Sequence, residues 1–342
     1  MLKKLDYLRI KKELIKSEKP FFFFHDDPDG LCSFLLLYRF VNKGKGQVVK
    51  TDPRISVDSV EKVKSFGADK VFITDIAVVD QEFIDKVGIP VIWIDHHQPL
   101  DRKNVLYFNP RIEGNDNHPA TYLCYNVVEQ DLWIAAIGAI GDYFIPNYMH
   151  EFAEKYPKLL EDGDITHPNK ILYGTELGKL IRMFSFALKG KSQDYGKCIK
   201  ILTRVENPEE ITEGTTSRGR FIAKRFEYIN KLYLKLKKEA MKKATKNKIL
   251  LYTYEEDTMS FTGDLANELL HECPDKVIII ARNKSGRYKC SMRSVKYLLP
   301  EILEKAMLGI DAHGGGHEHA CGANVAEKDF PEFLERIEKE LT

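Results

Sequence analysis

The sequence is poor in cysteine and has no long apolar run. Its six cysteines are widely spaced, without a CxxC pair, so a disulfide framework like that of small secreted domains is not expected. No apolar stretch approaches the ~20 residues that a bilayer-spanning helix needs. The first nineteen residues are charged throughout, unlike a signal peptide. These absences predict a soluble, cytoplasmic protein with reduced thiols.

Internal repeats and low-complexity tracts are also missing from the 342 residues. Hydrophobic residues make up 43% of the sequence and charged residues 30%. This composition is typical of globular proteins and argues against a disordered or fibrous chain. The length exceeds that of most single domains, so we expect two domains.

The net charge of +1 conceals one strongly basic stretch, residues 218–248, with twelve Lys or Arg and only two Glu. Apolar residues recur there at helical spacing, which predicts a long amphipathic helix linking two domains. The basic helix could guide a phosphate backbone, or its charges could be the solvated face of a linker. Its aromatic residues are expected to pack against the domains rather than stack on bases: Phe221, Phe226, Tyr228 and Tyr233.

Short apolar runs alternate with helical patterns in the first 100 residues. Three of these runs end directly in acidic or imidazole side chains: 21–24 before His25, 71–74 before Asp75, and 91–94 before Asp95-His96-His97. A helical face follows Gly30, and another spans 81–87. This alternation predicts a parallel sheet with helices on its faces, in which ligands gather beyond the carboxyl ends of the strands.

The remainder of the chain shows a helical region and a second α/β pattern. Residues from about 149 to 213 are predicted to be mostly helical, and the second pattern begins near Ile249. The runs 277–281 and 288–292 flank Asn283-Lys284-Ser285-Gly286, which indicates a hairpin. A glycine-rich segment, Gly314-Gly315-Gly316-His317, follows a further helical pattern.

Six acidic or imidazole side chains come from four separate segments, at strand ends or loops: His25, Asp27, Asp29, Asp75, His96 and Asp142. Any one of them alone is more often a helix cap or a turn residue, and Asp29 before Gly30 would be read as a cap. Together, however, so many carboxylates would repel one another unless cations held them. Such a set suits two divalent ions ~3.5–4 Å apart that promote in-line displacement at phosphorus.

These segments resemble, in order and spacing, the four motifs of the DHH phosphoesterase superfamily. The motifs are His25-Asp26-Asp27-Pro28-Asp29-Gly30, Asp75, Asp95-His96-His97 and Gly138-Ala139-Ile140-Gly141-Asp142. Ser291-Met292-Arg293-Ser294 and the glycine-rich segment resemble the smaller DHH-associated domain of the RecJ-like and nano-RNase branch. The similarity spans about residues 20–145 and 250–330.

The resemblance implies a role for each residue of the motifs. His25, Asp27 and Asp75 would hold one manganese or magnesium ion, and Asp29, Asp75, His96 and Asp142 the other, with Asp75 bridging. Asp95 would orient an imidazole. His97 would face the scissile phosphate as a charge stabiliser or proton donor, unless it serves as a ligand instead. Asp26 is expected to be a solvated loop acid.

In the second domain the resemblance implies a clamp for a terminal nucleotide: Ser291, Arg293, Gly315, Gly316 and His317. An arginine can bind phosphate through two hydrogen bonds, and glycines let backbone N–H groups approach an anion closely. The alternative is a zinc cluster of His313, His317, His319 and Cys321, although the glycines between them would not impose a tetrahedral frame.

The predicted fold is therefore α/β: an N-terminal parallel-sheet domain (1–150), a helical segment with the basic linker helix (151–248), and a smaller α/β domain (249–342), with the active site in the cleft between them. The resemblance implies a single-strand exonuclease, 3′ to 5′ by analogy, that releases nucleoside monophosphates from DNA or RNA with two ions, Mn²⁺ before Mg²⁺. An alternative is an enzyme for di- to tetranucleotides, cyclic dinucleotides or 3′-phosphoadenosine phosphate. Another alternative is a non-catalytic subunit of a replication or repair assembly. Replication or repair proteins are also expected as partners of an active enzyme.

Overall fold

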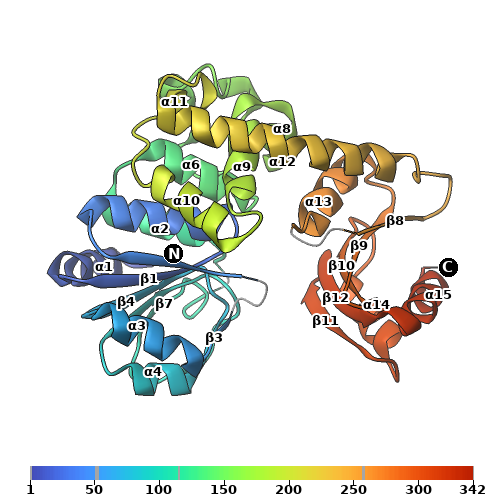
Figure 1. Cartoon of the computed structure of the whole chain (residues 1–342), viewed down its shortest axis with the longest axis horizontal. Helices are drawn as coiled ribbons and strands as arrows, with labels where there is room; N and C mark the ends of the chain where they lie inside the picture. Colours follow the sequence, from blue (N-terminus) through green and yellow to red (C-terminus); the bar gives the residue numbers. More distant parts are fainter. Residues whose placement is uncertain (1, 51–53, 115, 256–258, 342) are drawn as a thin grey trace. The chain divides into compact units, whose positions relative to one another are not determined.

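The computed structural model describes residues 2–50, 54–114, 116–255 and 259–341. The chain divides into two compact units, of which Figure 1 shows the first in blue to yellow and most of the second in gold to red. The N-terminal unit comprises residues 1–188 and 195–224, and the C-terminal unit comprises residues 189–194 and 225–342. No helix in the described ranges is both long enough and apolar enough to span a membrane.

The N-terminal unit is built on a five-stranded sheet in the order β2-β1-β4-β6-β7. Its strands are all parallel: β1 Pro20–His25, β2 Lys45–Val49, β4 Lys70–Thr74, β6 Val91–Ile94 and β7 Leu106–Phe108. Two short strands, β3 Arg54–Ile55 and β5 Val78–Val79, pair separately. The helices around this sheet are α1 Lys4–Lys16, α2 Pro28–Val41, α3 Val60–Phe66, α4 Gln81–Val87, α5 Ala120–Val128 and α6 Leu132–Gly141. The parallel sheet predicted from the sequence is confirmed.

Four consecutive phenylalanines of β1 are buried because helices cover both faces of the sheet. Phe24 stacks on Phe34 of α2 with ring centroids 4.5 Å apart. Phe23 points to the other face, where its ring meets Phe83 of α4 at 5.9 Å. Figure 1 shows α2 and α6 on one side of this sheet and α3 and α4 on the other.

The region from 149 to 213 is helical, as its pattern predicted. Its helices are α7 Met149–Lys155, α8 Pro168–Gly174, α9 Glu176–Ala187, α10 Ser192–Leu202 and α11 Glu209–Thr212. The basic stretch forms the predicted long helix, α12 Ser217–Met241. Phe226 and Tyr233 are buried on its inner face as expected, but Tyr228 is 74% exposed. The packing expectation is thus wrong for Tyr228, which lies on the solvent side of the helix.

The C-terminal unit has a second five-stranded sheet in the order β11-β12-β10-β9-β8. Its strands are β8 Ile249–Glu255, β9 Val277–Lys284, β10 Arg287–Arg293, β11 Ala312–His317 and β12 Ala320–Ala326, with helices α13 Thr262–Glu272, α14 Leu299–Met307 and α15 Phe330–Glu340. The predicted hairpin joins β9 to β10 through Ser285 and Gly286, whose positive φ values of 53° and 73° suit a two-residue turn. The smaller C-terminal α/β fold is confirmed.

Candidate metal centre

The order of the N-terminal sheet brings three chain segments together at one edge. β4 lies between β1 and β6, and these strands end at His25, before Asp75 and before Asp95-His96-His97. Since parallel strands end at the same edge, the acidic and imidazole groups that follow them become neighbours. Asp75 follows the middle strand and is therefore flanked by groups from both sides.

Asp75 lies between two imidazoles. Its Oδ2 is 3.4 Å from His25 Nδ1 and its Oδ1 is 3.3 Å from His96 Nε2. Each imidazole also lies near further carboxylates. His25 Nδ1 is 2.8 Å from Asp27 Oδ2. His96 Nε2 is 3.9 Å from Asp29 Oδ2, and His96 Nδ1 is 3.7 Å from Asp142 Oδ2. The structure thus brings together all six residues that the sequence singled out as metal ligands.

The N-cap of α2 is Asp27, so Asp29 does not have the cap role that its position alone would suggest. Asp27 Oδ1 accepts a hydrogen bond of 2.9 Å from the backbone N–H of Gly30. Asp29 is buried and accepts hydrogen bonds from the N–H groups of Ala120 and Thr121 at 2.9 and 2.7 Å. Asp29 therefore stabilises the N-terminus of α5, a favourable place for a carboxylate, while it faces the cluster.

Asp142 reaches the cluster from the C-terminus of a helix, α6, rather than from a strand end or a loop. Two glycines of its motif allow α6 to pack closely enough. A Cβ at Gly138 would lie 2.2 Å from Thr121 Oγ1, and one at Gly141 would lie 2.7 Å from Pro28 Cβ. A side chain at either position would push α6 away from the start of α2 or α5 and displace Asp142.

The electrostatics of the cluster favour a bound cation. Burial raises the pKa of Asp29, and the neighbouring Asp75 and Asp142 raise it further. Burial and the Asp75 carboxylate likewise raise the pKa of Asp142, to about 7, against the opposing effect of His96. Burial would also raise the pKa of Asp75, but His25 and His96 hold it well below its usual range. Positive charge is thus needed before all of these carboxylates can ionise together near neutral pH.

The donor set also fits metal binding in its geometry. Three overlapping groups have ligand atoms that lie within 4.8 Å of one another: His25, Asp27 and Asp75; Asp29, His96 and Asp142; and Asp75, His96 and His97. Oδ2 of Asp75 is buried and accepts no hydrogen bond within the described part of the chain. A buried carboxylate oxygen without a hydrogen bond is costly, and a cation would compensate it.

His97 is held by a buried network that the sequence did not predict in full. Its Nδ1 lies 2.8 Å from Asp95 Oδ1, as expected for an acid that orients an imidazole. Asn109 donates from its side-chain amide to Tyr107 Oη and to the backbone carbonyl of His97, both at 2.9 Å. The Tyr107 hydroxyl and the Asn109 amide also reach Asp95 Oδ2, each at 3.3 Å. Asn109 directly follows β7, the strand next to β6, and this position was the signal that could have identified it.

Two further residues near the centre differ from expectation or were missed. Asp26 is only 28% exposed and its Oδ2 lies 3.6 Å from Lys50 Nζ, so it is not a simple solvated acid. Asn117 Oδ1 lies 3.2 Å from His96 Nδ1 and can orient that imidazole. No strand-end pattern marks Asn117, because it lies in the loop before α5.

In the C-terminal unit, strand register places four of the five predicted substrate-binding residues on one face. Arg293 of β10 and His317 of β11 both pair with Ala320 of β12, and Ser291 and Gly315 both pair with Gly322. The four residues therefore form two adjacent rows on the same side of the sheet. Gly316 lies between Gly315 and His317 with φ 153°, where a Cβ would approach the Ala320 carbonyl to 2.3 Å.

The guanidinium of Arg293 is oriented by its neighbours. Nε donates to Asn267 Oδ1 of α13 at 2.6 Å, and Nη1 donates to the Met292 carbonyl at 2.9 Å. The zinc alternative has less support, because Cys321 pairs with Gly316 and is buried in the core, whereas His317 is exposed on the opposite face. Among the described residues, the groups that could hold a metal all lie in the N-terminal unit.

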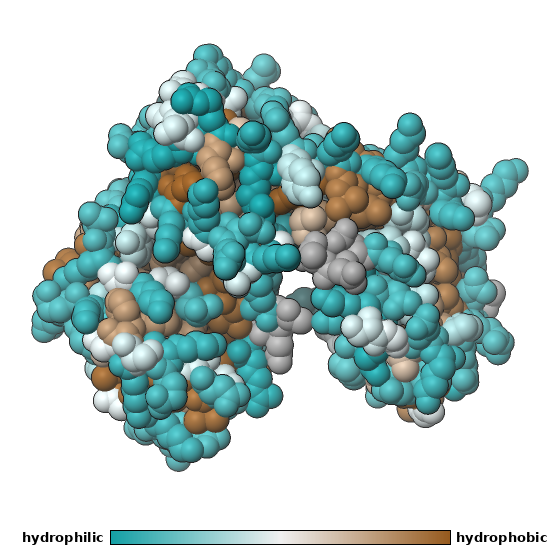
Figure 2. Space-filling view, in the orientation of Figure 1, coloured by the Kyte–Doolittle hydropathy of each residue, from teal (hydrophilic) through white to brown (hydrophobic). Residues whose placement is uncertain are grey.

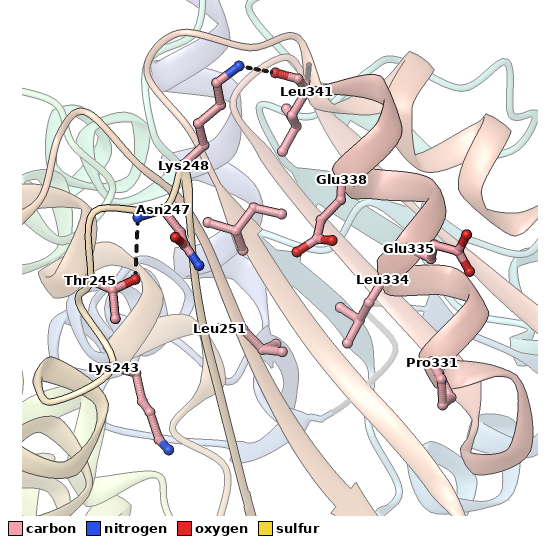
Figure 3. Close-up of a pocket in the computed structure, with 11 residues that line it drawn as sticks. Lys243, Thr245, Asn247, Lys248, Leu251, Pro331, Leu334, Glu335, Glu338 and Leu341 are labelled. Atoms are coloured by element: carbon pink, nitrogen blue, oxygen red, sulfur yellow. Dashed lines mark hydrogen bonds between the residues drawn. The ribbon is translucent and has the colours of Figure 1, made fainter.

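A pocket of about 590 Å³ lies elsewhere in the C-terminal unit, between the start of β8 and α15 (Figure 3). Leu251 and Leu334 form part of its apolar lining, and Glu338 projects into it from α15. None of the predicted metal-binding or substrate-binding residues lines this pocket. We therefore assign it no part in the candidate centre.

Comparison with known families identifies both parts of the chain. Residues 21–150 match the family model for the DHH family, N-terminal domain, and residues 246–342 match that for the DHHA1 domain. The chain belongs to the DHH phosphoesterase superfamily. This result confirms the resemblance seen in the four motifs and in the glycine-rich segment. A search of curated proteins finds no significant match to the sequence.

Solved structures of DHH proteins share the fold at low sequence identity. RecJ from Thermus thermophilus in complex with Mn²⁺ has a TM-score of 0.70 and 16% identity over 99% of this chain, which spans 55% of the RecJ chain. A manganese-bound exonuclease RecJ has a TM-score of 0.66 and 16% identity over 99% of this chain and 94% of its own. The pGpG-specific phosphodiesterase PggH from Vibrio cholerae has a TM-score of 0.51 and 14% identity, over 94% of this chain and 98% of its own. This DHH chain therefore has a RecJ-like fold.

Proposed function

We propose that this protein is a metal-dependent phosphodiesterase that degrades single-stranded DNA or RNA from the 3′ end and releases nucleoside monophosphates. The observation that carries the proposal is the position of Asp75 between two groups of ligands, with one oxygen 3.4 Å from His25 and the other 3.3 Å from His96. This geometry suits a bridging carboxylate in a two-ion centre. RecJ structures with manganese support Mn²⁺ as the ion.

Each residue of the cluster then has a defined task. A pair of bound divalent ions would polarise the phosphate and lower the pKa of the attacking water. His25, Asp27 and Asp75 would hold one ion, and Asp29, His96 and Asp142 would hold the other together with Asp75. Nδ1 of His97 is hydrogen-bonded to the Asp95 carboxylate. Nε2 is therefore the atom that would donate a proton or a hydrogen bond to the phosphate.

End-labelled single strands of graded length test the proposal directly. DNA and RNA of 2 to 30 nucleotides, labelled at the 5′ end, would be incubated with Mn²⁺ or with chelator. A 3′ to 5′ exonuclease gives a ladder of shortening labelled products, whereas the opposite polarity releases labelled mononucleotide at once. Activity should disappear with the chelator and return with added Mn²⁺. No hydrolysis of any strand under these conditions would exclude the exonuclease.

Substrates of two to four nucleotides are the second candidate. The fold similarity to a pGpG-specific phosphodiesterase favours it, because that enzyme is named for a dinucleotide. Cleavage confined to the shortest members of the length series would select this candidate over the exonuclease. Cyclic dinucleotides and 3′-phosphoadenosine phosphate, included in the same assay, would separate the remaining short substrates.

Replacing Arg293 by alanine should raise KM about ten- to hundredfold and leave kcat within about twofold. A guanidinium that binds a terminal phosphate equally in ground and transition states affects binding alone, and a charged hydrogen bond of this kind contributes roughly 1.5–3 kcal/mol. Arg287→Ala is the matched control, since Arg287 begins the same strand and pairs with Asp311 at 3.0 Å instead. Equal KM values for the two variants would argue against the clamp.

The affinity for Mn²⁺ should fall as the pH drops below 7. Asp142 has a pKa of about 7 in the protein alone, mainly because it is buried. Below that pH its carboxylate is protonated, and the proton competes with Mn²⁺ for the same oxygen atoms. The Asp27 and Asp75 carboxylates also raise the pKa of His25 despite its burial, and a protonated imidazole cannot be a ligand. One competing proton weakens binding by about tenfold per pH unit. Equilibrium titration of free Mn²⁺ at pH 6, 7 and 8 measures the effect, and constant affinity across this range would contradict it.

A further inference from the structure

The outward face of α12 carries a continuous row of cations within the C-terminal unit. Lys231, Lys235 and Lys238 follow one another at spacings of four and three residues, and Lys242 continues the row just beyond the helix end. This spacing places them along one side of the helix. All four are exposed, and Figure 2 shows hydrophilic side chains along the upper edge of the view, where α12 runs in Figure 1. We call these four lysines and Tyr228 the basic stripe.

The stripe lysines are not paired as the cations of other helices are. Glu227 and Glu239 lie four residues from Lys231 and Lys235, but no ion pair joins them, and the Glu239 carboxylate accepts a hydrogen bond from Tyr252 Oη at 2.8 Å instead. On α15, Arg336 pairs with Glu332 and Lys339 with Glu335, one turn apart, at 2.6 and 2.8 Å. On α12 itself, Lys237 lies off the stripe and pairs with Glu268 at 2.7 Å. The stripe lysines form no ion pair with the described residues. Like charges one turn apart destabilise a helix, so an external polyanion would relieve the repulsion.

Tyr228 extends the stripe by one further step of three residues and adds an aromatic ring. Its side chain is 74% exposed, so the ring is accessible to a ligand in solution. From Tyr228 to Lys242 the stripe spans about 21 Å at 1.5 Å per residue. A line of cations with an aromatic ring at one end matches surfaces that bind the phosphates of a single strand and stack one of its bases.

We propose that the basic stripe is an accessory binding track for single-stranded nucleic acid, which contacts phosphates and stacks a base on Tyr228 and includes none of the candidate metal ligands. The choice of ligand rests on the proposed function, and the stripe extends it: the protein would favour long strands over di- and trinucleotides. A row of cations that have no ion-pair partner among the described residues indicates recognition of phosphate spacing rather than of base sequence.

Binding in the presence of a chelator tests the stripe independently of hydrolysis. The variant Lys231→Gln/Lys235→Gln/Lys238→Gln/Lys242→Gln keeps strong helix formers on an exposed face, and circular dichroism would verify its fold. Its affinity for a labelled 20-nucleotide single strand should fall about tenfold or more at 0.1 M salt. The slope of log affinity against log salt should decrease in size by about 2 to 3, because each neutralised phosphate of a single strand contributes ~0.7 to it. Tyr228→Ala should weaken binding by roughly fivefold or more without changing this slope.

The matched control replaces four lysines by glutamine in the N-terminal unit, near the strand starts and thus at the sheet edge opposite the candidate metal ligands: Lys12, Lys16, Lys62 and Lys64. They are exposed on α1 and α3, the helices that precede β1 and β4. This variant loses the same charge and should bind the 20-mer with unchanged affinity and salt slope. A milder variant, Lys231→Gln/Lys238→Gln, should show about half of the slope change that the quadruple variant shows. It replaces the quadruple variant if that protein fails to fold.

Three results would overturn the proposal. The fourfold stripe variant and its control could show equal affinity and salt slope, which would make the stripe a solvated surface. The affinity advantage of a 20-mer over a trimer could stay the same in the stripe variant. Vesicles containing phosphatidylserine could bind through the stripe while the 20-mer does not, which would assign it to a membrane surface. If the protein bound the 20-mer through the stripe but hydrolysed no substrate, the proposed function would be refuted, whereas the stripe would still be a nucleic-acid binding surface.

Discussion

Asp75→Asn should lower kcat by about three orders of magnitude or more, which corresponds to roughly 4 kcal/mol of transition-state stabilisation. The Asp75 carboxylate lies between His25 and His96, at 3.4 and 3.3 Å, so its removal would take a ligand from both proposed ions at once. Its Oδ2 is buried without a hydrogen bond from the described residues, which leaves that oxygen available for a cation. Single-turnover hydrolysis of an end-labelled strand with saturating Mn²⁺ measures the loss.

Asparagine is the appropriate replacement because of the backbone at this position. Asp75 has a φ of 56°, in the left-handed region that asparagine and aspartate tolerate better than most residues. Asp75→Asn therefore changes charge without adding backbone strain, whereas alanine would combine the two effects. An unchanged melting temperature would verify that the loss is chemical.

Asp80→Asn is the matched control for this experiment. Asp80 also follows a strand, β5, but its carboxylate pairs with Arg54 at 2.9 Å. An exposed pair of this kind contributes at most about 1 kcal/mol to stability, so the activity of this variant should stay within about twofold. If Asp75→Asn retained a tenth of the activity, the two-ion assignment would be wrong.

The cluster of candidate metal ligands was predictable because its signals are local in the sequence. A buried strand needs a continuous apolar run, and the run must stop where a charged ligand begins, as at Phe24 and His25. Parallel pairing then brings such ends to one edge. The positions of Asp75 and His96 follow from these two rules without knowledge of side-chain packing.

Other features depend on tertiary contacts that no local pattern encodes. The hydrogen bonds of Asp29 come from α5, whose first residues lie about ninety positions further along the chain. Asn109 contacts Asp95 because β7 is the neighbour of β6 in the sheet. Asp142 sits at a helix end, and only the close packing that Gly138 and Gly141 permit brings it to the centre. An apolar run such as 132–140 is compatible with a buried strand or a buried helix, and the structure selects the helix.

His97→Gln should lower kcat by about 10²–10⁴-fold, the usual contribution of a positioned proton donor, with Mn²⁺ affinity within about threefold of the original protein. The reason is the buried contact of Nδ1 with Asp95 at 2.8 Å, which leaves Nε2 as the atom able to act on the phosphate. Measuring kcat and the Mn²⁺ binding constant on the same samples separates this role from metal binding.

His96→Gln provides the comparison that decides between the two imidazoles. Its ring lies among Asp75, Asp29 and Asp142 at 3.3 to 3.9 Å, so its loss should weaken Mn²⁺ binding by tenfold or more, as for other metal-site residues. His97 also belongs to a group that could hold a metal, with Asp75 and His96. If His97→Gln reduced Mn²⁺ affinity as much as His96→Gln, His97 would be a ligand, and the proton donor would have to be another group near the phosphate.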